Sequence, residues 1–429
     1  MMNTFDVIII GAGTSGLMAS VAAAEKGKRV LLVEKNKRIG KKLLLTGGGR
    51  CNVTNNRSSD EIIAHIPGNG KFLYSAFSQY DNHDIINFFE ANGVKLKEED
   101  HGRMFPETDR SQTIVETLHE KLKELSVTLY TEAAVRKVLK KDEQIIGVEL
   151  INQKVYAPCV IIATGGKTYP STGSTGDGYK FAKAMGHSIE TLYPTESPIR
   201  SEESFIKEKT LQGISLRNVA LSVLSKKNKP IISHTMDILF THFGLSGPAA
   251  LRCSSFVNQQ LSQEGVSTVS LSLDIFPEES AKQLLNELSK KITAEPEKLL
   301  KNTLKQFLPE RLLDFLLTKQ KLIALKGKQV SEVQLETFVS NLKDFRIEAS
   351  GTFPIEKSFV TGGGIALKEI NPKTMESKRI EGLYFCGEVL DINGYTGGYN
   401  ITAALVTGHC AGVHAAEASE YSQYRIEGY

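Results

Sequence analysis

"FDVIIIGAGTSGLMASVAAAEKGKRVLLVE", residues 5–34, decides the fold of this chain. It opens with a β-branched apolar run, residues 5–10, which is typical of a buried parallel strand. The glycine-rich GAGTSG follows directly, and we expect an alanine-rich helix over residues 17–26. A second apolar strand then ends in Glu34, 23 positions after Gly11. The stretch therefore predicts a βαβ unit with an acidic residue after its second strand.

Each glycine of the GxGxxG motif has a separate task in such a unit. Gly11 permits the tight turn after the strand, Gly13 lets the backbone approach a pyrophosphate, and Gly16 lets helix and strand pack closely. The helix N-terminus attracts the pyrophosphate, and Glu34 accepts hydrogen bonds from ribose hydroxyls. A lone GxGxxG would also fit a glycine turn in a generic α/β protein. The complete βαβ unit with its acid instead indicates a dinucleotide-binding site.

The segment after Glu34 distinguishes between dinucleotides. It brings positive charge and then a long glycine-rich connection, TGGGRCN at residues 46–52, instead of a second βαβ unit. Such a connection suits FAD, because an extended cofactor needs a backbone track from its pyrophosphate to its flavin ring. Arg50 is a candidate to hold a phosphate or to stabilise negative charge on reduced flavin. Cys51 is either an activated thiol or, as we favour, a small buried cysteine.

Two later strands are expected at the same edge of this sheet. Residues 159–163 form an apolar run that ends in ATGG, and residues 382–388 form another that ends in Gly-Glu. Ligands in open α/β sheets lie at the carboxyl ends of the strands. We expect Glu388 to bind the ribitol hydroxyls. The helix from Ile401 should direct its positive N-terminus at the flavin ring.

The chain has 429 residues, which predicts two or three domains. We expect an α/β fold: a Rossmann-like FAD-binding domain of the glutathione-reductase type, interrupted by a β-barrel that itself carries a helical insert. The FAD-binding domain should comprise residues 1–192 and 355–429, because the nucleotide-binding pattern returns at the C-terminal end. Alternating strands suggest a β-barrel-like insert over 193–276 and 343–354. Three apolar helical stripes suggest the helical insert, 277–342.

Composition excludes several other classes of protein. Hydrophobic residues make up 41% and charged residues 24%, with a net charge of +3, so the whole chain gives no charge argument for nucleic acid or membrane binding. The five cysteines form no CxxC pair, which argues against a disulfide scaffold and a zinc or other metal site. The sequence shows neither a signal peptide nor a run long enough to span a membrane. We therefore expect a cytoplasmic protein that is not bound to a membrane.

Six motifs in this order carry a resemblance to a known family: GxGxxG with Glu34, TGGGRCN, GRMFP (102–106), ATGG, LFTHFGLSGPA (239–249) and CGEVLDINGYTGGYNITAA (386–404). Over nearly the whole chain, the sequence resembles the YhiN/BaiN-like family of FAD-dependent oxidoreductases. The resemblance implies an FAD domain built from both chain ends. Some members of that family are tied to NAD(P)H-dependent reduction of carbon–carbon double bonds in steroid-like substrates.

We expect these residues to line FAD, in most cases because their motifs match those of the family. Val135 is expected to contact adenine through its backbone, and Lys35 and Lys42 to contribute positive charge. The expected cofactor-binding residues are Gly11, Gly13, Ser15, Gly16, Glu34, Lys35, Lys42, Thr46, Gly48, Gly49, Arg50, Cys51, Asn52, Val135, Ala163, Thr164, Gly165, Gly387, Glu388, Asp391, Gly397, Gly398, Tyr399, Asn400 and Ile401.

For the chemistry, flavin N5 would pass a hydride to an unsaturated small molecule, and the protein would place the substrate and supply a proton. The candidate catalytic residues are His242 and Arg103. The simpler interpretations are structural: His242 would hydrogen-bond a turn, and Arg103 would hold two domains together. NAD(P)H is expected as a transient hydride donor. A second GxGxxG that would bind it is missing from the sequence. Oligomeric state is left open.

Two other functions remain open. Residues 298–328 hold eight basic residues against Glu310 and Asp314, which suggests a flavoprotein acting on RNA or on a nucleotide-bearing substrate. A solvated helix face explains the same charges, and the nearby Phe307 and Phe315 occupy core-like positions, so we do not expect nucleic acid as a partner. A flavin-bound sensor without turnover is the other alternative.

Overall fold

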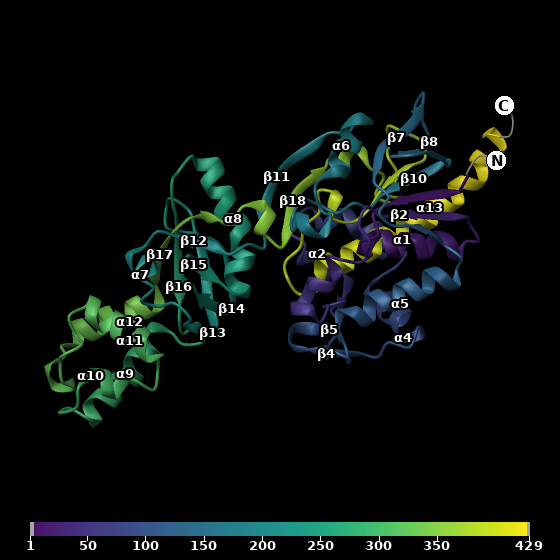
Figure 1. Ribbon diagram of the computed structural model, residues 1–429. Helices are drawn as coiled ribbons and strands as arrows, with labels where there is room; N and C mark the ends of the chain where they lie inside the picture. The colour runs from purple at the N-terminus through teal and green to yellow at the C-terminus, as the bar shows by residue number, and fades with distance from the viewer. Residues whose placement is uncertain (1–3, 427–429) are drawn as a thin grey trace. The chain divides into compact units, whose positions relative to one another are not determined.

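The computed structural model describes residues 4–426, which form two compact units (Figure 1). Unit 1 comprises Met1–Tyr193 and Ile355–Tyr429, and unit 2 comprises Pro194–Pro354. Unit 1 is therefore discontinuous in sequence and unit 2 is not. In the described part of the chain, no helix has both the length and the apolar character that a membrane span requires.

A five-stranded parallel sheet forms the centre of unit 1, in the order β19-β10-β1-β2-β6. The four strands β19, β10, β1 and β2 are buried along their whole length, which is why their sequences are continuous apolar runs. The predicted Rossmann-like sheet is thereby confirmed. Its strands are β1 (Val7–Ile10), β2 (Val30–Val33), β6 (Thr128–Tyr130), β10 (Cys159–Ile162) and β19 (Leu383–Phe385).

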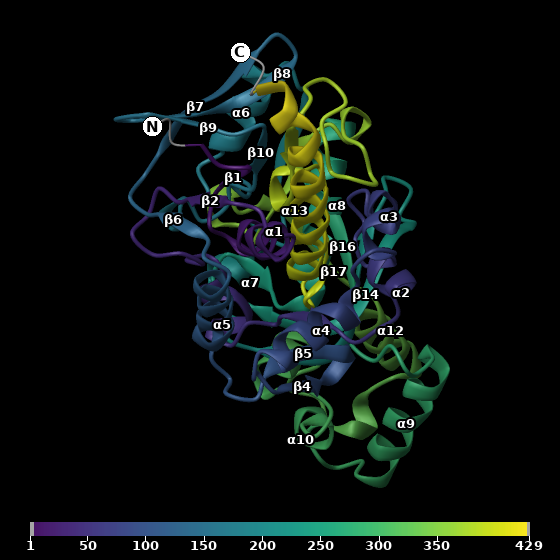
Figure 2. The same cartoon turned by 90° about the vertical axis from the view of Figure 1, so that its right-hand side faces the viewer.

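Two helices from opposite ends of the sequence lie side by side on this sheet. Helix α1 (Thr14–Glu25) follows β1, and α13 (Tyr399–Ile426) is the last helix, as both ribbon views show (Figures 1 and 2). A Cβ at Gly408 of α13 would lie 2.3 Å from the Ser15 carbonyl oxygen, so only glycine permits this contact. Helix α13 begins two residues before, and ends well after, the helix expected from residue 401 to about 412.

The remaining elements of unit 1 surround these two layers. The predicted antiparallel meander is present as β7-β8-β9, whereas the sheet β3-β5-β4 and the pair β11-β18 were not predicted. These elements are β3 (Thr54–Asn55), α2 (Ser59–Ala64), α3 (Tyr74–Phe77), α4 (Asn82–Ala91), β4 (Leu96–Glu99), β5 (Arg103–Pro106), α5 (Ser111–Glu124), β7 (Val135–Lys141), β8 (Gln144–Leu150), β9 (Lys154–Tyr156), α6 (Asp177–Ala184), β11 (Ile189–Thr195) and β18 (Val360–Ile365).

Unit 2 contains a closed barrel of strand order β12-β15-β14-β13-β16-β17, which confirms the predicted β-barrel. Helix α8 (Pro248–Glu264) and the short strands β12 and β15 were missed from the sequence. The barrel strands are β12 (Ile199–Ser201), β13 (Ser215–Leu224), β14 (Pro230–Phe240), β15 (Gly244–Ser246), β16 (Val269–Asp274) and β17 (Phe345–Thr352), and the short helix α7 (Ser204–Lys207) follows β12.

The helical region of unit 2 shares one hydrophobic core with the barrel. Phe315 from the helices lies 5.3 Å from the Phe205 ring and 6.2 Å from the Phe345 ring, centroid to centroid. A boundary between barrel and helical insert therefore stays a prediction. The helices are α9 (Ala281–Ala294), α10 (Leu300–Leu304), α11 (Glu310–Lys319) and α12 (Glu332–Lys343).

Candidate functional site

The carboxyl ends of β1, β10 and β19 meet at one edge of the parallel sheet of unit 1. A Cβ at Gly11, after β1, would lie 2.7 Å from the carbonyl oxygen of Ala163, after β10. A Cβ at Gly387, after β19, would lie 2.4 Å from Ser15 Oγ in the first turn of α1. The expected ligand edge thus brings together residues far apart in the sequence.

The glycine motif leaves room for a ligand at the start of α1. A Cβ at Gly16 would lie 1.9 Å from the Gly11 carbonyl oxygen, so this glycine lets the helix start directly against the strand. A Cβ at Gly13 would meet no atom within 4 Å. Gly13 is also the N-cap of α1, and no side chain there caps the helix. Open space and free N–H groups at a helix N-terminus form a site suited to a pyrophosphate.

Glu34 is fixed beside this motif at the end of β2. Its carboxylate accepts hydrogen bonds from Ala12 N at 2.9 Å and from Asn36 N at 2.8 Å. Ala133 N donates to the Glu34 carbonyl oxygen at 3.0 Å, which brings the chain that enters β7 at Val135 to the same place. A carboxylate for ribose hydroxyls and a backbone segment for adenine thus lie next to each other. Asn36, which helps to hold Glu34, was not predicted from the sequence.

The triple-glycine loop presents open backbone. Gly47, Gly48 and Gly49 have φ values of 57°, 67° and 87°, which other residues adopt only with strain. A Cβ at Gly48 or Gly49 would meet no atom within 4 Å. Asn52 Oδ1 and, after β10, Thr164 Oγ1 are buried without a hydrogen-bond partner among the described residues. Both oxygens point to a partner that the protein itself does not supply.

An ion pair joins the N-terminal and C-terminal halves of the site. Lys42 Nζ lies 2.7 Å from Glu388 Oε2 and 2.6 Å from Thr168 Oγ1. Thr361 N donates to Glu388 Oε1 at 2.8 Å. Burial raises the pKa of Glu388, but Lys42 and Thr361 outweigh burial and hold the pKa below its ordinary value. Glu388 is therefore a charged acceptor at neutral pH.

Thr168 and Thr361 were not predicted from the sequence. A repeated tripeptide could have indicated Thr361. The tripeptide TGG occurs at residues 46–48, 164–166, 361–363 and 396–398. Three of these segments had been assigned to the site, and the fourth, in β18, supplies the bond to Glu388. Lys35, in contrast, pairs with Asp177 Oδ2 at 2.6 Å, and this bond ties it to the start of α6.

Arg50 and Cys51 have structural partners. The Arg50 guanidinium binds Glu99 and Asp109, whose hydrogen bonds raise its pKa, and it lies 4.3 Å from the centre of the Phe105 ring. Cys51 is fully buried, and burial raises the pKa of its thiol to about 12. The thiol is therefore protonated at neutral pH, which argues against an activated nucleophile. Contact of either residue with flavin stays a prediction.

The C-terminal GGYN segment lies against the glycine loop. Asn55 Nδ2 donates to the Gly397 carbonyl oxygen at 3.0 Å, and a Cβ at Gly398 would lie 3.1 Å from Asn52 Oδ1. Asn400 Nδ2 donates to the Gly394 carbonyl oxygen at 2.7 Å, which closes the turn before α13. Among the other predicted residues of this segment, Tyr399 is buried and stacks on His65, and Asp391 accepts a bond from Asn69.

The two candidate catalytic residues belong to different units. Arg103 starts β5 in unit 1, where it pairs with Asp100, and its guanidinium lies 5.4 Å from the centre of the Phe105 ring. His242 lies in the turn between β14 and β15 in unit 2, with its side chain exposed and its ring 5.0 Å from that of Phe243. A catalytic role for either residue stays a prediction.

Comparison with known proteins identifies the family. The model of the HI0933-like protein Rossmann domain matches residues 5–414. This chain belongs to the HI0933-like family. Its resemblance to YhiN/BaiN-like proteins is thereby confirmed, and it is a flavoprotein oxidoreductase. The open glycines and unpartnered oxygens described above fit FAD as the cofactor.

Two curated relatives span almost the whole chain. Ribosomal RNA dihydrouridine synthase of Escherichia coli K12 is 34% identical over 400 residues, covering 93% of this chain and 95% of the relative. The 3-dehydro-bile acid delta(4,6)-reductase of Clostridium scindens is 29% identical over 412 residues, covering 95% and 98%. Among solved structures, 3-ketosteroid delta1-dehydrogenase from Sterolibacterium denitrificans has the same fold, with a TM-score of 0.52 at 14% identity and coverage of 97% and 100%.

Proposed function

We propose that this flavoprotein reduces the C5=C6 double bond of a uridine in ribosomal RNA, with NAD(P)H as the source of the hydride. The observation that carries this proposal is the similarity to two ribosomal RNA dihydrouridine synthases. The Escherichia coli relative is 34% identical and the Haemophilus influenzae relative 32% identical, both over more than nine tenths of this chain. The sequence alone favoured a small molecule over RNA, and the relatives reverse that order.

The chemistry suits the site that the chain builds. In uracil, C6 is the β-carbon of an unsaturated carbonyl, so reduction needs a hydride at C6 and a proton at C5. When bound, FAD supplies the hydride. The remaining tasks fall to the protein, which must hold the ring, keep water out and deliver the proton. His242 is our candidate for the proton donor, because histidine is the commonest general acid in proteins. Arg103 is our candidate to polarise the uracil carbonyl, because its guanidinium donates hydrogen bonds but keeps its proton.

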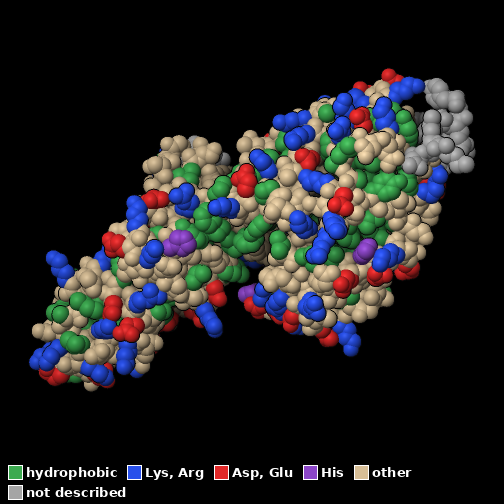
Figure 3. Space-filling model, viewed as in Figure 1, with side chains coloured by type: hydrophobic (Ala, Val, Ile, Leu, Met, Phe, Trp, Pro, Cys, Tyr) green, Lys and Arg blue, Asp and Glu red, His purple; other side chains and the backbone are tan. Residues whose placement is uncertain are grey.

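The charge distribution determines how an RNA substrate would be held. Unit 2 holds 21 Lys and Arg against 18 Asp and Glu, which accounts for the whole net charge of +3 of the chain. On the face shown in Figure 3, basic and acidic side chains are interspersed and do not form a continuous basic track. We therefore expect moderate phosphate contact spread over several lysines, with additional affinity from contacts to bases.

A second candidate function is reduction of a steroid-like enone. The bile acid reductase from Clostridium scindens supports it, because the alignment covers 98% of that relative. Both candidates share one reaction type, reduction of a carbon–carbon double bond conjugated to a carbonyl. They differ in the size and charge of the substrate.

The decisive experiment has two stages. The purified yellow protein is first mixed anaerobically with NADH or NADPH while flavin absorbance is followed, and we expect one of them to bleach the flavin. Unmodified ribosomal RNA made by transcription is then added with that donor, and its nucleosides are analysed by mass spectrometry. Dihydrouridine would support the proposal. Flavin that is reoxidised by a 3-oxo-4-ene steroid but not by RNA would replace the proposal with the second candidate.

A further inference from the structure

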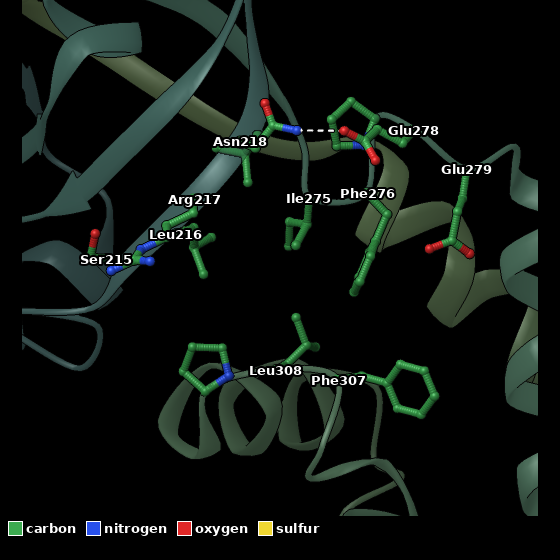
Figure 4. A pocket seen from close by; sticks show the side chains of 13 residues that line it. Ser215, Leu216, Arg217, Asn218, Ile275, Phe276, Glu278, Glu279, Phe307 and Leu308 are labelled. Atoms are coloured by element: carbon green, nitrogen blue, oxygen red, sulfur yellow. Dashed lines mark hydrogen bonds between the residues drawn. The ribbon is translucent and has the colours of Figure 1, made fainter. Parts of the chain in front are cut away.

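A cavity of about 370 Å³ lies within unit 2, and all of its lining residues belong to that unit (Figure 4). Its walls come from the start of β13, the loop after β16 and the chain between α10 and α11. Apolar side chains form its interior and polar ones its rim. The lining includes Arg217, Asn218, Phe276, Glu278, Phe307 and Leu308.

A β-bulge builds the polar rim. The register between β13 and β14 shifts between Leu216 and Val219, and Asn218 adopts a left-handed conformation with φ 49°. Asn218 N donates to Asp237 Oδ1 at 3.0 Å, and Asn218 Nδ2 donates to Glu278 Oε1 at 2.7 Å. The bulge leaves both Arg217 and Asn218 exposed, where an ordinary strand would turn one of them inward.

Two aromatic side chains belong to the lining, one from each side, and both are partly buried. Phe276 extends from the loop after β16, Leu308 points toward it from the chain between α10 and α11, and Phe307 lies beside Leu308 (Figure 4). Lys343 Nζ donates to the Phe276 carbonyl oxygen at 2.6 Å and pairs with Asp274 at 2.8 Å, which fixes the loop after β16. The sequence predicted Phe307 in an apolar core stripe, and the structure packs it against the core of unit 2 while leaving it partly exposed at the cavity.

The lining selects a flat ligand with apolar faces and hydrogen-bonding edges. Phenyl rings and a guanidinium plane stack on nucleobases, and an Asn–Glu pair offers donors and acceptors to a base edge. The carboxylates of Glu278 and Glu279 at the rim disfavour a phosphate inside the cavity. Arg217 and Lys305 supply positive charge outside for the backbone of the same strand.

We propose that this cavity binds an unpaired nucleobase of the RNA substrate, one other than the uridine that is reduced. The inference rests on the proposed function, which makes RNA the substrate, and adds a second binding site for that RNA. Such a contact would raise affinity for single-stranded segments and fix the register of the strand.

The chain contains no tryptophan, which gives a direct test. Phe307→Trp places a single tryptophan in the cavity and keeps a ring for stacking. A single-stranded RNA 12-mer of mixed sequence should quench its fluorescence saturably, and the same strand with abasic linkers should not. Val333→Trp is the matched control, because Val333 is 69% exposed at the start of α12 in the same helical region. Quenching that is equal in both proteins, or absent, would overturn the proposal.

Affinity measurements complete the test. Phe307→Leu keeps apolar bulk but removes the ring, and Arg217→Ala changes only an exposed rim residue. We expect Phe307→Leu to weaken binding of the 12-mer by about five- to a hundredfold, the range for loss of one stacked base. Arg217→Ala should weaken binding less, because it removes a contact to the RNA backbone and no stacked ring. The control Arg346→Ala, on β17, should have a smaller effect. Unchanged binding by both variants would contradict the cavity's role, whatever the protein's activity.

The same proteins separate this inference from the proposed function. Dihydrouridine formation by the wild-type protein tests the function and does not require the cavity. Base-dependent quenching tests the cavity and does not require turnover. If the wild-type protein forms dihydrouridine but Phe307→Trp shows no base-dependent quenching, the proposed function is supported and the role of the cavity is contradicted.

Discussion

Thr164 Oγ1 is a buried hydroxyl without a partner among the described residues, at the end of β10 where the cofactor is expected. A buried hydroxyl that makes no hydrogen bond costs roughly 1–3 kcal/mol of stability. Thr164→Val, which replaces the hydroxyl by a methyl, should therefore leave the flavin-free protein as stable or more stable. The same change should weaken FAD binding by about two- to tenfold, because it removes a group that a ligand would satisfy. Urea unfolding and a flavin fluorescence titration measure the two effects. Lower stability with unchanged FAD affinity would show that the hydroxyl serves the fold alone.

Gly48→Val tests the open glycine loop. Valine would introduce a side chain into the space above the loop and strain a backbone with φ 67°. We expect most of the FAD to be lost on purification, as read from the ratio of flavin to protein absorbance. Gly93→Val is the matched control, because Gly93 also has positive φ (82°) and open space but ends helix α4. Equal FAD loss in both variants would attribute the effect to backbone strain.

A buried hydrogen-bond network in unit 1 connects the residues just before β11 with the segment between β18 and β19. His187 Nδ1 lies 3.1 Å from Glu369 Oε2, and His187 Nε2 lies 2.9 Å from Ser377 Oγ. Glu369 also accepts from Ser188 N and Arg379 Nη2. Burial raises the pKa of Glu369, but these donors outweigh it and bring the pKa from 4.5 to about 2. Burial also lowers the pKa of His187.

This network predicts a stability that falls in two steps on acidification. Both pKa values are lower in the folded protein than in the unfolded chain, so both groups contribute most at high pH. Stability should fall first below pH 6.5, where unfolded His187 takes up a proton, and again from pH 4.5 toward 2, where Glu369 does. Glu369→Gln should lower stability near neutral pH and abolish the second step, while a step that belongs to His187 remains. Urea unfolding at a series of pH values measures both, and a variant that keeps the second step would assign it to other carboxylates.

Elements that depend on local pattern were predictable from the sequence, and elements that depend on distant partners were not. Strands β1, β2 and β10 are continuous apolar runs, and their sequence alone identifies them. Strands β12 and β15 have three residues each and exist because the barrel supplies neighbours on both sides. The partners of Arg50 lie 49 and 59 residues away, and no spacing rule links them. The glycine motifs of the site were visible because backbone geometry restricts them to glycine.

On the scale of the whole molecule, the proposed RNA substrate predicts an interaction that weakens with salt, because each phosphate contact releases bound counterions. Affinity for single strands falls with a slope of about −0.7 per phosphate contact in a plot of log K against log salt. Lys305→Gln and Lys321→Gln should each reduce this slope by about 0.7 if the lysine meets a phosphate. Lys137→Gln, in the meander of unit 1, is the control. Slopes that do not change in any variant would place the RNA elsewhere.

The discontinuity of unit 1 also determines the order in which the molecule can form during synthesis. Strand β1 and helix α1 leave the ribosome before unit 2, yet their sheet lacks β19 and their helix layer lacks α13 until residues 383–426 have been made. Unit 2 is continuous in sequence and has its own hydrophobic core. Unit 2 can therefore fold to completion before unit 1, while strand β1 must wait with its apolar surface uncovered. A flavin-binding site that needs segments on both sides of unit 2 can bind its cofactor only after α13 has been made.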